Sequence, residues 1–408
     1  MASNPELSLM TKLLNLEGIK VKNYCLVEGV GVLIYLESQA KTATCPHCGQ
    51  TSNKLHQNRE YTVRDLPLAE QAVYLKVNRR RWKCHGCGRI FAEEFNWVKK
   101  QRTYTERLKA KVIEQVLESD IKNVATRTGM SQQEIETIFK ELSQELCQKK
   151  PVGITKLGID EIALVKGQKN YCAVLVDIDK RVIVALLQTR TKEEIIQHLK
   201  TWGEEILEQI TEVSIDLWKP YKTVVKQLMP KAEIVADRFH VTQQVNNELD
   251  AARKKVKTEA KKLKNKSQRE QILNGITNSK YVLLKNESEL TDKEREKLEQ
   301  LKEVTPKLGK MHSLKEAFRQ VFENSKDWVE GLFGFSEWLT EALEYFPKSS
   351  QTIKRWLGEI IAYFDQRTTQ GVVEGINNKI KLIKRRAYGF RNFSNFRIRC
   401  LLNWHLNC

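Results

Sequence analysis

The chain has 408 residues, 41% of them hydrophobic, and a formal net charge of +18 at pH 7. This hydrophobic content is enough to build folded cores, so it excludes a wholly disordered protein, and the length predicts two or three domains. No run approaches the ~18 consecutive apolar residues of a transmembrane helix, so we expect no membrane association.

The excess of basic residues indicates a polyanionic partner. Lys and Arg number 69 against 51 Asp and Glu, and this imbalance favours nucleic acid over a role in solubility alone. The first 18 residues carry no basic patch ahead of an apolar stretch. No secretory signal is therefore predicted, and we expect the protein in the cytoplasm.

Two Cys-x-x-Cys pairs in the N-terminal quarter predict a zinc ribbon. The cysteines are Cys45, Cys48, Cys84 and Cys87. Four thiolates complete the tetrahedral site that structural Zn²⁺ prefers, whereas intracellular cysteines rarely form disulfides. Val73, Leu75 and Val77 alternate with other residues as in a strand that leads into the second pair. Four unligated thiols are the alternative.

Three consecutive arginines, Arg79, Arg80 and Arg81, precede the second cysteine pair. Clustered cations beside a zinc ribbon are suited to gripping phosphates, so we expect them to contact DNA. A solvated strand end is the alternative.

Residues 121–142 have the pattern of a helix-turn-helix. Ser131 and Glu134 fit a capping box that starts the second helix, and a turn over 129–131 precedes it. The outer face of that helix carries Gln132, Gln133 and Lys140, which are expected to contact bases or phosphates in a major groove. Two packed helices without DNA contacts are the alternative.

The segment from 156 to 237 predicts three antiparallel strands, then helix, strand, helix and strand. The expected strands cover 157–161, 171–178, 181–187, 213–216 and 233–236, with helices over 192–210 and 219–229. This is the order of an RNase H-like fold, in which the first and fourth strands are neighbours. Asp160 and Asp216 end those strands, so their carboxylates should lie side by side. Close carboxylates repel one another, and binding divalent cations relieves the repulsion.

A third acid, Glu374, is expected on a helix that packs against this sheet. After Glu374 the chain has no acid but eight basic residues. Those expected to contact a DNA backbone are Lys379, Lys381, Lys384, Arg385 and Arg386. With three acids, two Mg²⁺ ions ~4 Å apart can serve phosphodiester chemistry, and Mn²⁺ is an alternative. Each acid taken singly could also be a salt-bridged surface residue.

These segments together resemble the DDE transposases of bacterial insertion sequences, specifically the ISL-three family. The matching segments are CPHC and CHGC, residues 158–161, 215–221, 236–241, 373–381 and 386–390. The resemblance implies a transposase that binds the terminal inverted repeats of its element and catalyses metal-dependent strand cleavage and strand transfer. It assigns Asp160, Asp216 and Glu374 as the DDE triad, with Asp160 bridging both metal ions.

Asp237 also ends a predicted strand, so it competes with Asp216 for the role of second acid. Strand order favours Asp216. Asp237 and His240 are therefore expected to support the site or to contact DNA.

The predicted architecture is an α/β multidomain protein. It comprises a zinc-ribbon domain over 1–100, a helix-turn-helix domain over 101–150, the first part of an RNase H-like catalytic core over 151–240, a helical insertion over 241–365, and the core's C-terminal helix with a basic tail over 366–408. Within the insertion, residues 253–269 predict a basic helix, with Lys254 and Lys255 on a DNA backbone.

The expected partners are double-stranded DNA, as element ends and as target, and a second copy of the chain, because two ends must be held together. Such a protein is expected at the nucleoid in the bacterial cytoplasm. A transposase-derived, non-catalytic DNA-binding regulator is the alternative function, and a nuclease that cuts without joining is a third.

Overall fold

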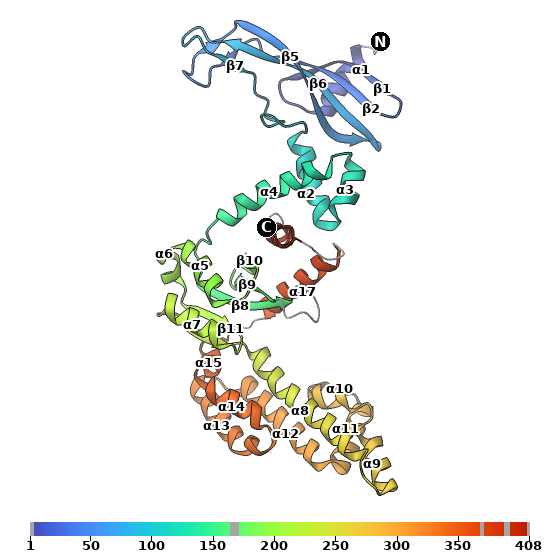
Figure 1. Cartoon of the computed structure of the whole chain (residues 1–408), viewed down its shortest axis with the longest axis vertical. Helices are drawn as coiled ribbons and strands as arrows, with labels where there is room; N and C mark the ends of the chain where they lie inside the picture. The colour runs from blue at the N-terminus through green and yellow to red at the C-terminus, as the bar shows by residue number, and fades with distance from the viewer. Residues whose placement is uncertain (1–3, 164–170, 368–370, 387–391, 406–408) are drawn as a thin grey trace. The chain divides into compact units, whose positions relative to one another are not determined.

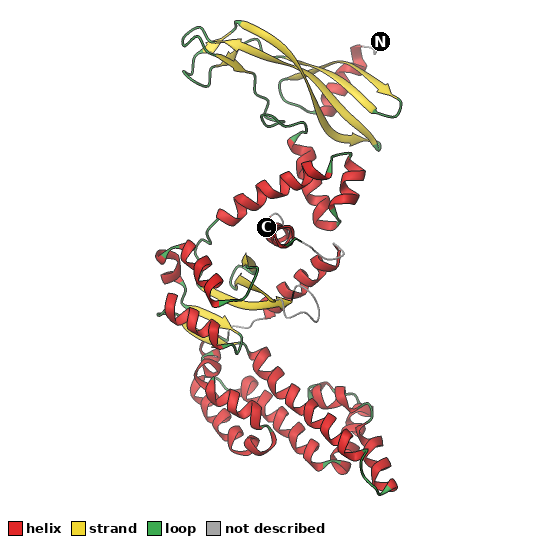
Figure 2. Ribbon diagram, viewed as in Figure 1, coloured by secondary structure: helices red, strands yellow, loops and turns green. Residues whose placement is uncertain are grey.

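The computed structural model describes residues 4–163, 171–367, 371–386 and 392–405 (Figure 1, Figure 2). Its contacts divide the chain into two compact units. The first unit contains Met1–Leu146 and Leu382–Leu402, and the second contains Cys147–Lys381 and Asn403–Cys408. No helix of the described residues has both the length and the apolar character needed to cross a membrane.

The first unit begins with a helix and a five-stranded sheet. The elements are α1 (Asn4–Leu14), β1 (Ile19–Val27), β2 (Gly31–Ser38), β5 (Leu55–Leu68), β6 (Gln71–Lys83) and β7 (Ile90–Ala92). The sheet order is β1-β2-β6-β5, with β7 paired to β6. Val73, Leu75 and Val77 are buried on one face of β6, which confirms the strand predicted before the second cysteine pair.

Three helices follow: α2 (Glu106–Glu118), α3 (Ile121–Thr128) and α4 (Gln132–Gln148). The predicted capping box is present, because the Ser131 N–H donates to Glu134 Oε2 at 2.8 Å and the Glu134 N–H donates to Ser131 Oγ at 3.2 Å. Gly129 ends α3 with a φ of +65°, a conformation that glycine adopts without strain. The helix α18 (Phe393–His405) buries Ile398 and Leu402 in the core of these helices.

The second unit contains the other five-stranded sheet. Its strands are β8 (Lys156–Ala163), β9 (Tyr171–Asp177), β10 (Val182–Leu186), β11 (Glu212–Ile215) and β12 (Glu233–Ala236). The order is β10-β9-β8-β11-β12, with β11 parallel to both β8 and β12. This confirms that the first and fourth strands are neighbours. The connecting helices α5 (Lys192–Trp202), α6 (Glu204–Gln209) and α7 (Lys219–Leu228) bury Leu199, Trp202 and Val224 in the same core.

Two long helices expected from the sequence are each broken into two. The helix expected over 192–210 is interrupted at Gly203, whose φ of +94° lies outside the helical region. The basic segment 253–269 is likewise not one helix. The helix α8 (Arg238–Ala260) ends inside it, and α9 (Lys266–Ile276) restarts where the Asn265 side chain caps the Gln268 N–H at 3.2 Å.

A helical bundle is formed by the residues between β12 and the C-terminal helices of the chain. It contains α8, α9, α10 (Ser279–Leu284), α11 (Asp292–Val304), α12 (Pro306–Asn324), α13 (Trp328–Tyr345), α14 (Pro347–Arg355), α15 (Leu357–Ile361) and α16 (Tyr363–Gln366). Its centre is aromatic, with Phe318, Phe322 and Phe335 fully buried and their ring centroids 5.0–5.5 Å apart. After the bundle, α17 (Gly371–Arg386) begins the C-terminal part of the chain.

Candidate active site and zinc centre

The carboxylates of Asp160 and Asp216 come together because β8 and β11 pair in parallel. The last residues in register are Ile159 and Ile215, so the two acids follow the same point of the ladder. The prediction that Asp160 ends its strand was wrong. The strand β8 continues to Ala163 through its antiparallel pairing with β9. The site therefore has one acid on a continuous strand and one at a strand end.

His240 joins the two acids to a third one, Asp237. Asp237 follows β12 and caps α8, accepting a hydrogen bond from the Phe239 N–H at 3.0 Å. The His240 Nδ1 lies 2.6 Å from Asp237 Oδ2 and 2.7 Å from Asp216 Oδ1. Ligand atoms of Asp160, Asp216 and His240 all lie within 4.8 Å of one another, which is the spacing of a metal site.

The electrostatics of this cluster follow from burial and proximity. Burial and the nearby charge of Asp216 raise the pKa of Asp160 to about 7. Burial opposes a charge on His240, but hydrogen bonds and attraction from Asp216 and Asp237 outweigh it and raise its pKa to about 10. At neutral pH the imidazolium therefore offsets part of the negative charge of the carboxylates.

Two buried oxygen atoms here are suited to a cation. Asn377 Oδ1 is buried without a hydrogen-bond partner in the described part of the chain, and Asp216 Oδ1 is buried and shares the single Nδ1–H of His240 with Asp237 Oδ2. Leaving buried oxygens without a donor is costly. Carboxylate and amide oxygens are the ligands that Mg²⁺ and Mn²⁺ prefer, so these residues fit a hard divalent cation.

The helix α17 packs directly on β8 beside the cluster. A Cβ on Gly158 would lie 3.0 Å from Val373 Cγ2, so the absence of a side chain there permits the close approach. One turn along, the Asn377 Nδ2 donates to Asp160 Oδ2. Glu374 lies between these two residues on α17, with an exposed side chain, and it is not in the group of ligand atoms within 4.8 Å.

Arg190 lies beside the cluster and was not singled out from the sequence. Its guanidinium pairs with Glu161, the residue after Asp160, and lies 4.5 Å from the Tyr171 ring centroid and 4.6 Å from that of Trp218. This arrangement connects β8, β9 and the segment after Asp216. No sequence motif signals it, since the contact is formed by residues far apart in the chain. Asn377 was likewise missed, although it lies inside a segment that the family resemblance covers.

The four cysteines of the two pairs converge at one point. Cys45 and Cys87 Sγ atoms are 3.6 Å apart, and Cys48 and Cys84 Sγ atoms are 3.4 Å apart. Bonds of 2.3 Å in a tetrahedron place sulfur atoms about 3.8 Å apart, so the geometry indicates a structural zinc. The Cys87 N–H lowers the pKa of the Cys84 thiol to about 6 against the effect of burial, which favours the thiolate that binds metal.

Comparison with known proteins identifies the family. A sequence model described as "Transposase" for family ISL3 matches residues 157–400, more than half of the chain. The model "zinc-finger of transposase IS204/IS1001/IS1096/IS1165" matches residues 41–87, and "Helix-turn-helix domain of transposase family ISL3" matches 93–143. The chain belongs to the ISL3 transposase family. Its zinc ribbon, helix-turn-helix and insertion-sequence transposase function agree with the expectations from the sequence.

Individual relatives agree with this assignment. The chain is 29% identical over 371 residues to the transposase for insertion sequence element IS1001 of Bordetella parapertussis, and the match covers 89% of each protein. It is 30% identical over 258 residues to the transposase for IS1557 of Mycobacterium tuberculosis, covering 59% of this chain and 57% of that protein. A 72-residue match at 40% identity to an ATP-dependent protease of Lactococcus lactis covers 17% of this chain, too little to bear on its activity.

The residues predicted to contact DNA differ in whether their side chains are exposed or already hydrogen-bonded within the protein. On β6, Arg79 Nε donates to the Glu93 carbonyl at 2.8 Å and Arg80 Nη2 donates to the Ser38 carbonyl at 2.8 Å, whereas Arg81 is exposed. Gln132, Gln133 and Lys140 are all exposed on α4, in the second helix of the helix-turn-helix. The three helix residues and Arg81 are therefore available to a DNA surface.

The basic residues of α8 and α17 also include some that are engaged within the protein and some that are exposed. Lys254 forms a close ion pair with Asp250 at 2.7 Å. Lys255 is more exposed, and its ion pair with Glu259 is longer, at 3.9 Å. Lys379 lies 4.4 Å from the Trp404 ring centroid and donates to the Asn403 carbonyl, so it has a structural role. Of the other α17 candidates, Lys384 is half-buried and Lys381, Arg385 and Arg386 are exposed.

Replacing Gly158 with Ala should disturb the site without removing a polar group. The new Cβ would push Val373 and the first turn of α17 away from β8, and we expect DNA cleavage to fall by about tenfold with DNA affinity unchanged. Adding Val373→Ala should restore much of the activity by giving the methyl group room. Full activity in the single variant, or no recovery in the double variant, would contradict this packing.

Removing zinc should unfold the ribbon. We expect the Cys84→Ser protein to lose its zinc and to become sensitive to protease between residues 41 and 95, because the metal holds together short strands that lack a large core of their own. Zinc content and limited proteolysis are the measurements, and Cys25→Ser, a half-buried cysteine outside the cluster, is the control. Equal zinc content in the two variants would rule out the four-cysteine site.

Proposed function

We propose that this transposase binds the terminal inverted repeats of its element and catalyses metal-dependent strand cleavage followed by strand transfer to target DNA. The observation that carries the proposal is the pairing of Asp160 and Asp216 on adjacent parallel strands, with Asp216 Oδ1 buried and sharing the His240 Nδ1–H with Asp237. The strand order supports an RNase H-like catalytic core, and the position of the bundle between β12 and α17 supports its being a helical insertion in that core.

Asp160, Asp216 and Glu374 are the proposed DDE triad. Glu374 is exposed as the helix stands, but α17 already reaches the cluster through Asn377, three residues further along. Residues three apart lie on the same face of a helix, so a small rotation or shift of α17 brings the Glu374 carboxylate to Asp160. Binding of metal and DNA supplies the free energy for such a shift.

Asp237 has a different proposed role. It caps α8 and hydrogen-bonds to His240, so both of its carboxylate oxygens are engaged, whereas Asp216 lies with Asp160 in the group of ligand atoms within 4.8 Å of one another. This supports Asp216 as the second acid, with Asp237 and His240 as positioning residues. The imidazolium of His240 would reduce the repulsion between the carboxylates of Asp216 and Asp237 and fix their orientation.

The proposed chemistry is phosphodiester hydrolysis at the element end and transesterification by the freed 3′-hydroxyl. The bound divalent ions, two Mg²⁺ or alternatively Mn²⁺, would supply activation of the attacking oxygen and stabilisation of the leaving oxygen. The residues of the chain orient the carboxylates: Asn377 and the Glu161 N–H, 2.7 Å from Asp160 Oδ1, fix Asp160. No covalent link between protein and DNA is needed.

The remaining parts of the chain are proposed to serve DNA binding and assembly. We propose domain limits at residues 1–100, 101–150, 151–240, 241–365 and 366–408, with the first two domains recognising the element ends. Exposed Gln132, Gln133, Lys140 and Arg81 support this. Holding two ends together requires at least a dimer on DNA, and a bacterial cytoplasmic location at the nucleoid follows from the substrate.

Substitution of the triad should separate binding from chemistry. We expect Asp160→Asn, Asp216→Asn and Glu374→Gln each to lower cleavage of an element-end DNA in Mg²⁺ by at least about a hundredfold, with DNA affinity changed little, since each removes a charge at the reacting phosphate. Glu205→Gln, an exposed acid on α6 of the same unit, is the matched control and should remain active.

The same assay decides between the competing functions. Tight binding of the element end without cleavage by the unaltered protein would favour a non-catalytic regulator. Cleavage without any joining to a target DNA would favour a nuclease. Full activity in Glu374→Gln would remove α17 from the proposed triad.

A further inference from the structure

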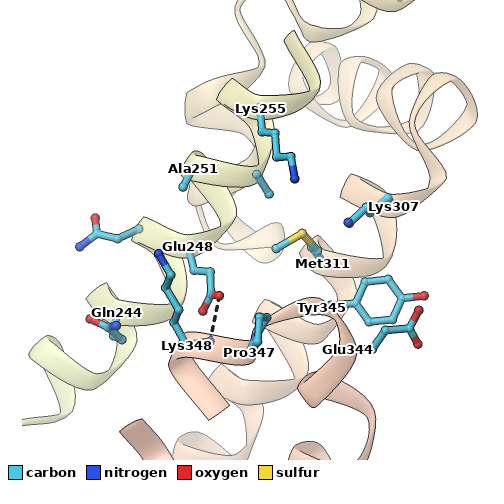
Figure 3. A pocket seen from close by; sticks show the side chains of 12 residues that line it. Gln244, Glu248, Ala251, Lys255, Lys307, Met311, Glu344, Tyr345, Pro347 and Lys348 are labelled. Atoms are coloured by element: carbon cyan, nitrogen blue, oxygen red, sulfur yellow. Dashed lines mark hydrogen bonds between the residues drawn. The ribbon is translucent and has the colours of Figure 1, made fainter. Parts of the chain in front are cut away.

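A hollow of about 510 Å³ lies in the helical bundle (Figure 3), and its lining does not include Asp160, Asp216 or Asp237. Its walls come from α8, α12, α13 and α14, which are all parts of the second unit. The volume falls within the range typical of pockets for small organic ligands, so it can accept a group as large as one nucleotide. Neither the family resemblance nor the proposed triad accounts for it.

Basic side chains converge on this hollow. Lys255 of α8 and Lys307 of α12 extend toward each other across it (Figure 3). Lys307 and Lys348 form no ion pair with any described residue, and the only acid paired with Lys255 is Glu259, 3.9 Å away and exposed. Ammonium groups that face each other without an intervening acid repel, and a bound anion removes that repulsion.

The two acids that line the hollow are placed away from these lysines or are already engaged. Glu248 accepts hydrogen bonds from the Lys348 N–H at 3.1 Å, the Ser349 N–H at 2.7 Å and Ser349 Oγ at 2.6 Å. It therefore caps the N-terminus of α14, as the dashed line in Figure 3 shows. Glu344 lies beside Tyr345 at the opposite edge from Lys255 (Figure 3).

The rest of the lining suits the other parts of a nucleotide. Met311, Ala251 and Pro347 give an apolar floor, and the amides of Gln244 and Asn247 offer donors and acceptors at the rim. The N-terminus of α12, which begins at a proline beside Lys307, adds positive potential. Phosphate, sugar and base can thus each meet a suitable surface.

We propose that this hollow binds one unpaired nucleotide of a DNA strand, with its phosphate between Lys255 and Lys307. The proposal rests on the DNA cleavage proposed above, and α8 connects the two sites. Asp237 caps the start of α8, and Lys255 lies 18 residues later, about 27 Å along the helix axis. A single strand that leaves the carboxylates along α8 reaches the hollow, whereas a duplex is too wide to enter between the helices.

Two double variants of the full-length protein isolate the hollow. Lys255→Ala with Lys307→Ala removes the converging charges. Lys302→Ala with Lys310→Ala is the matched control, since it removes two lysines of the same bundle that pair instead with Glu299 and Glu341. The probes are a 12-residue thymidylate strand, the corresponding duplex with a 12-residue deoxyadenylate strand, and free thymidine monophosphate, measured over a range of salt concentrations.

We expect the Lys255/Lys307 variant to bind the single strand at least about fivefold more weakly. Its salt dependence should flatten by about 0.7 in the log–log slope, because the variant loses one phosphate contact and each contributes about 0.7 for single strands. The control variant should change by less than about twofold. A strand carrying 5-iododeoxyuridine should cross-link, on irradiation, to a peptide that contains Met311 or Tyr345.

Several outcomes would overturn the proposal. Equal loss in the two double variants would indicate general electrostatic attraction, and equal loss of duplex binding would indicate an external backbone contact. Protection from cross-linking by thymidine monophosphate at micromolar concentration would assign the hollow to a free nucleotide instead of a DNA strand. Cross-links confined to other helices would place the strand elsewhere.

The test also separates this proposal from the catalytic one. The binding measurements are repeated in Asp160→Asn protein, where cleavage is expected to be absent. Strand binding that survives there and falls on adding the Lys255 and Lys307 changes supports the hollow whatever the chemistry at the carboxylates. Intact cleavage in the lysine variant with no change in strand binding would refute the hollow alone.

Discussion

The repulsion between two carboxylates held side by side is the constraint on which the rest of the second unit depends. Parallel pairing of β8 with β11 places Asp160 and Asp216 next to each other, and burial makes their joint ionisation costly. The protein offsets this cost with the His240 imidazolium and an amide from α17. These are the groups that a divalent cation would rearrange, which is why we place the chemistry of this ISL3 transposase at this point.

The elements that converge on the carboxylates are connected to the rest of the unit by long helices. Asp237 begins α8, which continues into the helical bundle, and α17 returns from the bundle to pack its Val373 against Gly158. The helical bundle, which α8 enters and from which α17 returns, can therefore influence the position of the acids. This connection is what gives the lysine-lined hollow on α8 a physical route to the proposed cleavage site.

Much of this arrangement could be predicted from the sequence, and the misses have identifiable causes. Local patterns sufficed for the two cysteine pairs and the capping box at Ser131, because each depends on spacing within a short segment. The succession of predicted strands and helices sufficed for the order of the second sheet. The break at Gly203 was missed because a single glycine is tolerated inside a helical pattern. The engagement of Lys379 with Trp404 depends on tertiary packing, which local patterns do not show. Arg190 and Asn377 were missed because their partners lie 29 and 217 residues away.

The most direct test of the central claim is a change of metal preference caused by sulfur. Sulfur accepts Mn²⁺ more readily than Mg²⁺, so a cysteine in place of a metal-binding acid should make cleavage depend on Mn²⁺. We predict that Asp216→Cys is inactive in Mg²⁺ and recovers in Mn²⁺, while Asp237→Cys shows no such recovery. Recovery by Asp237→Cys with none by Asp216→Cys would contradict the account and assign the second acid to the start of α8.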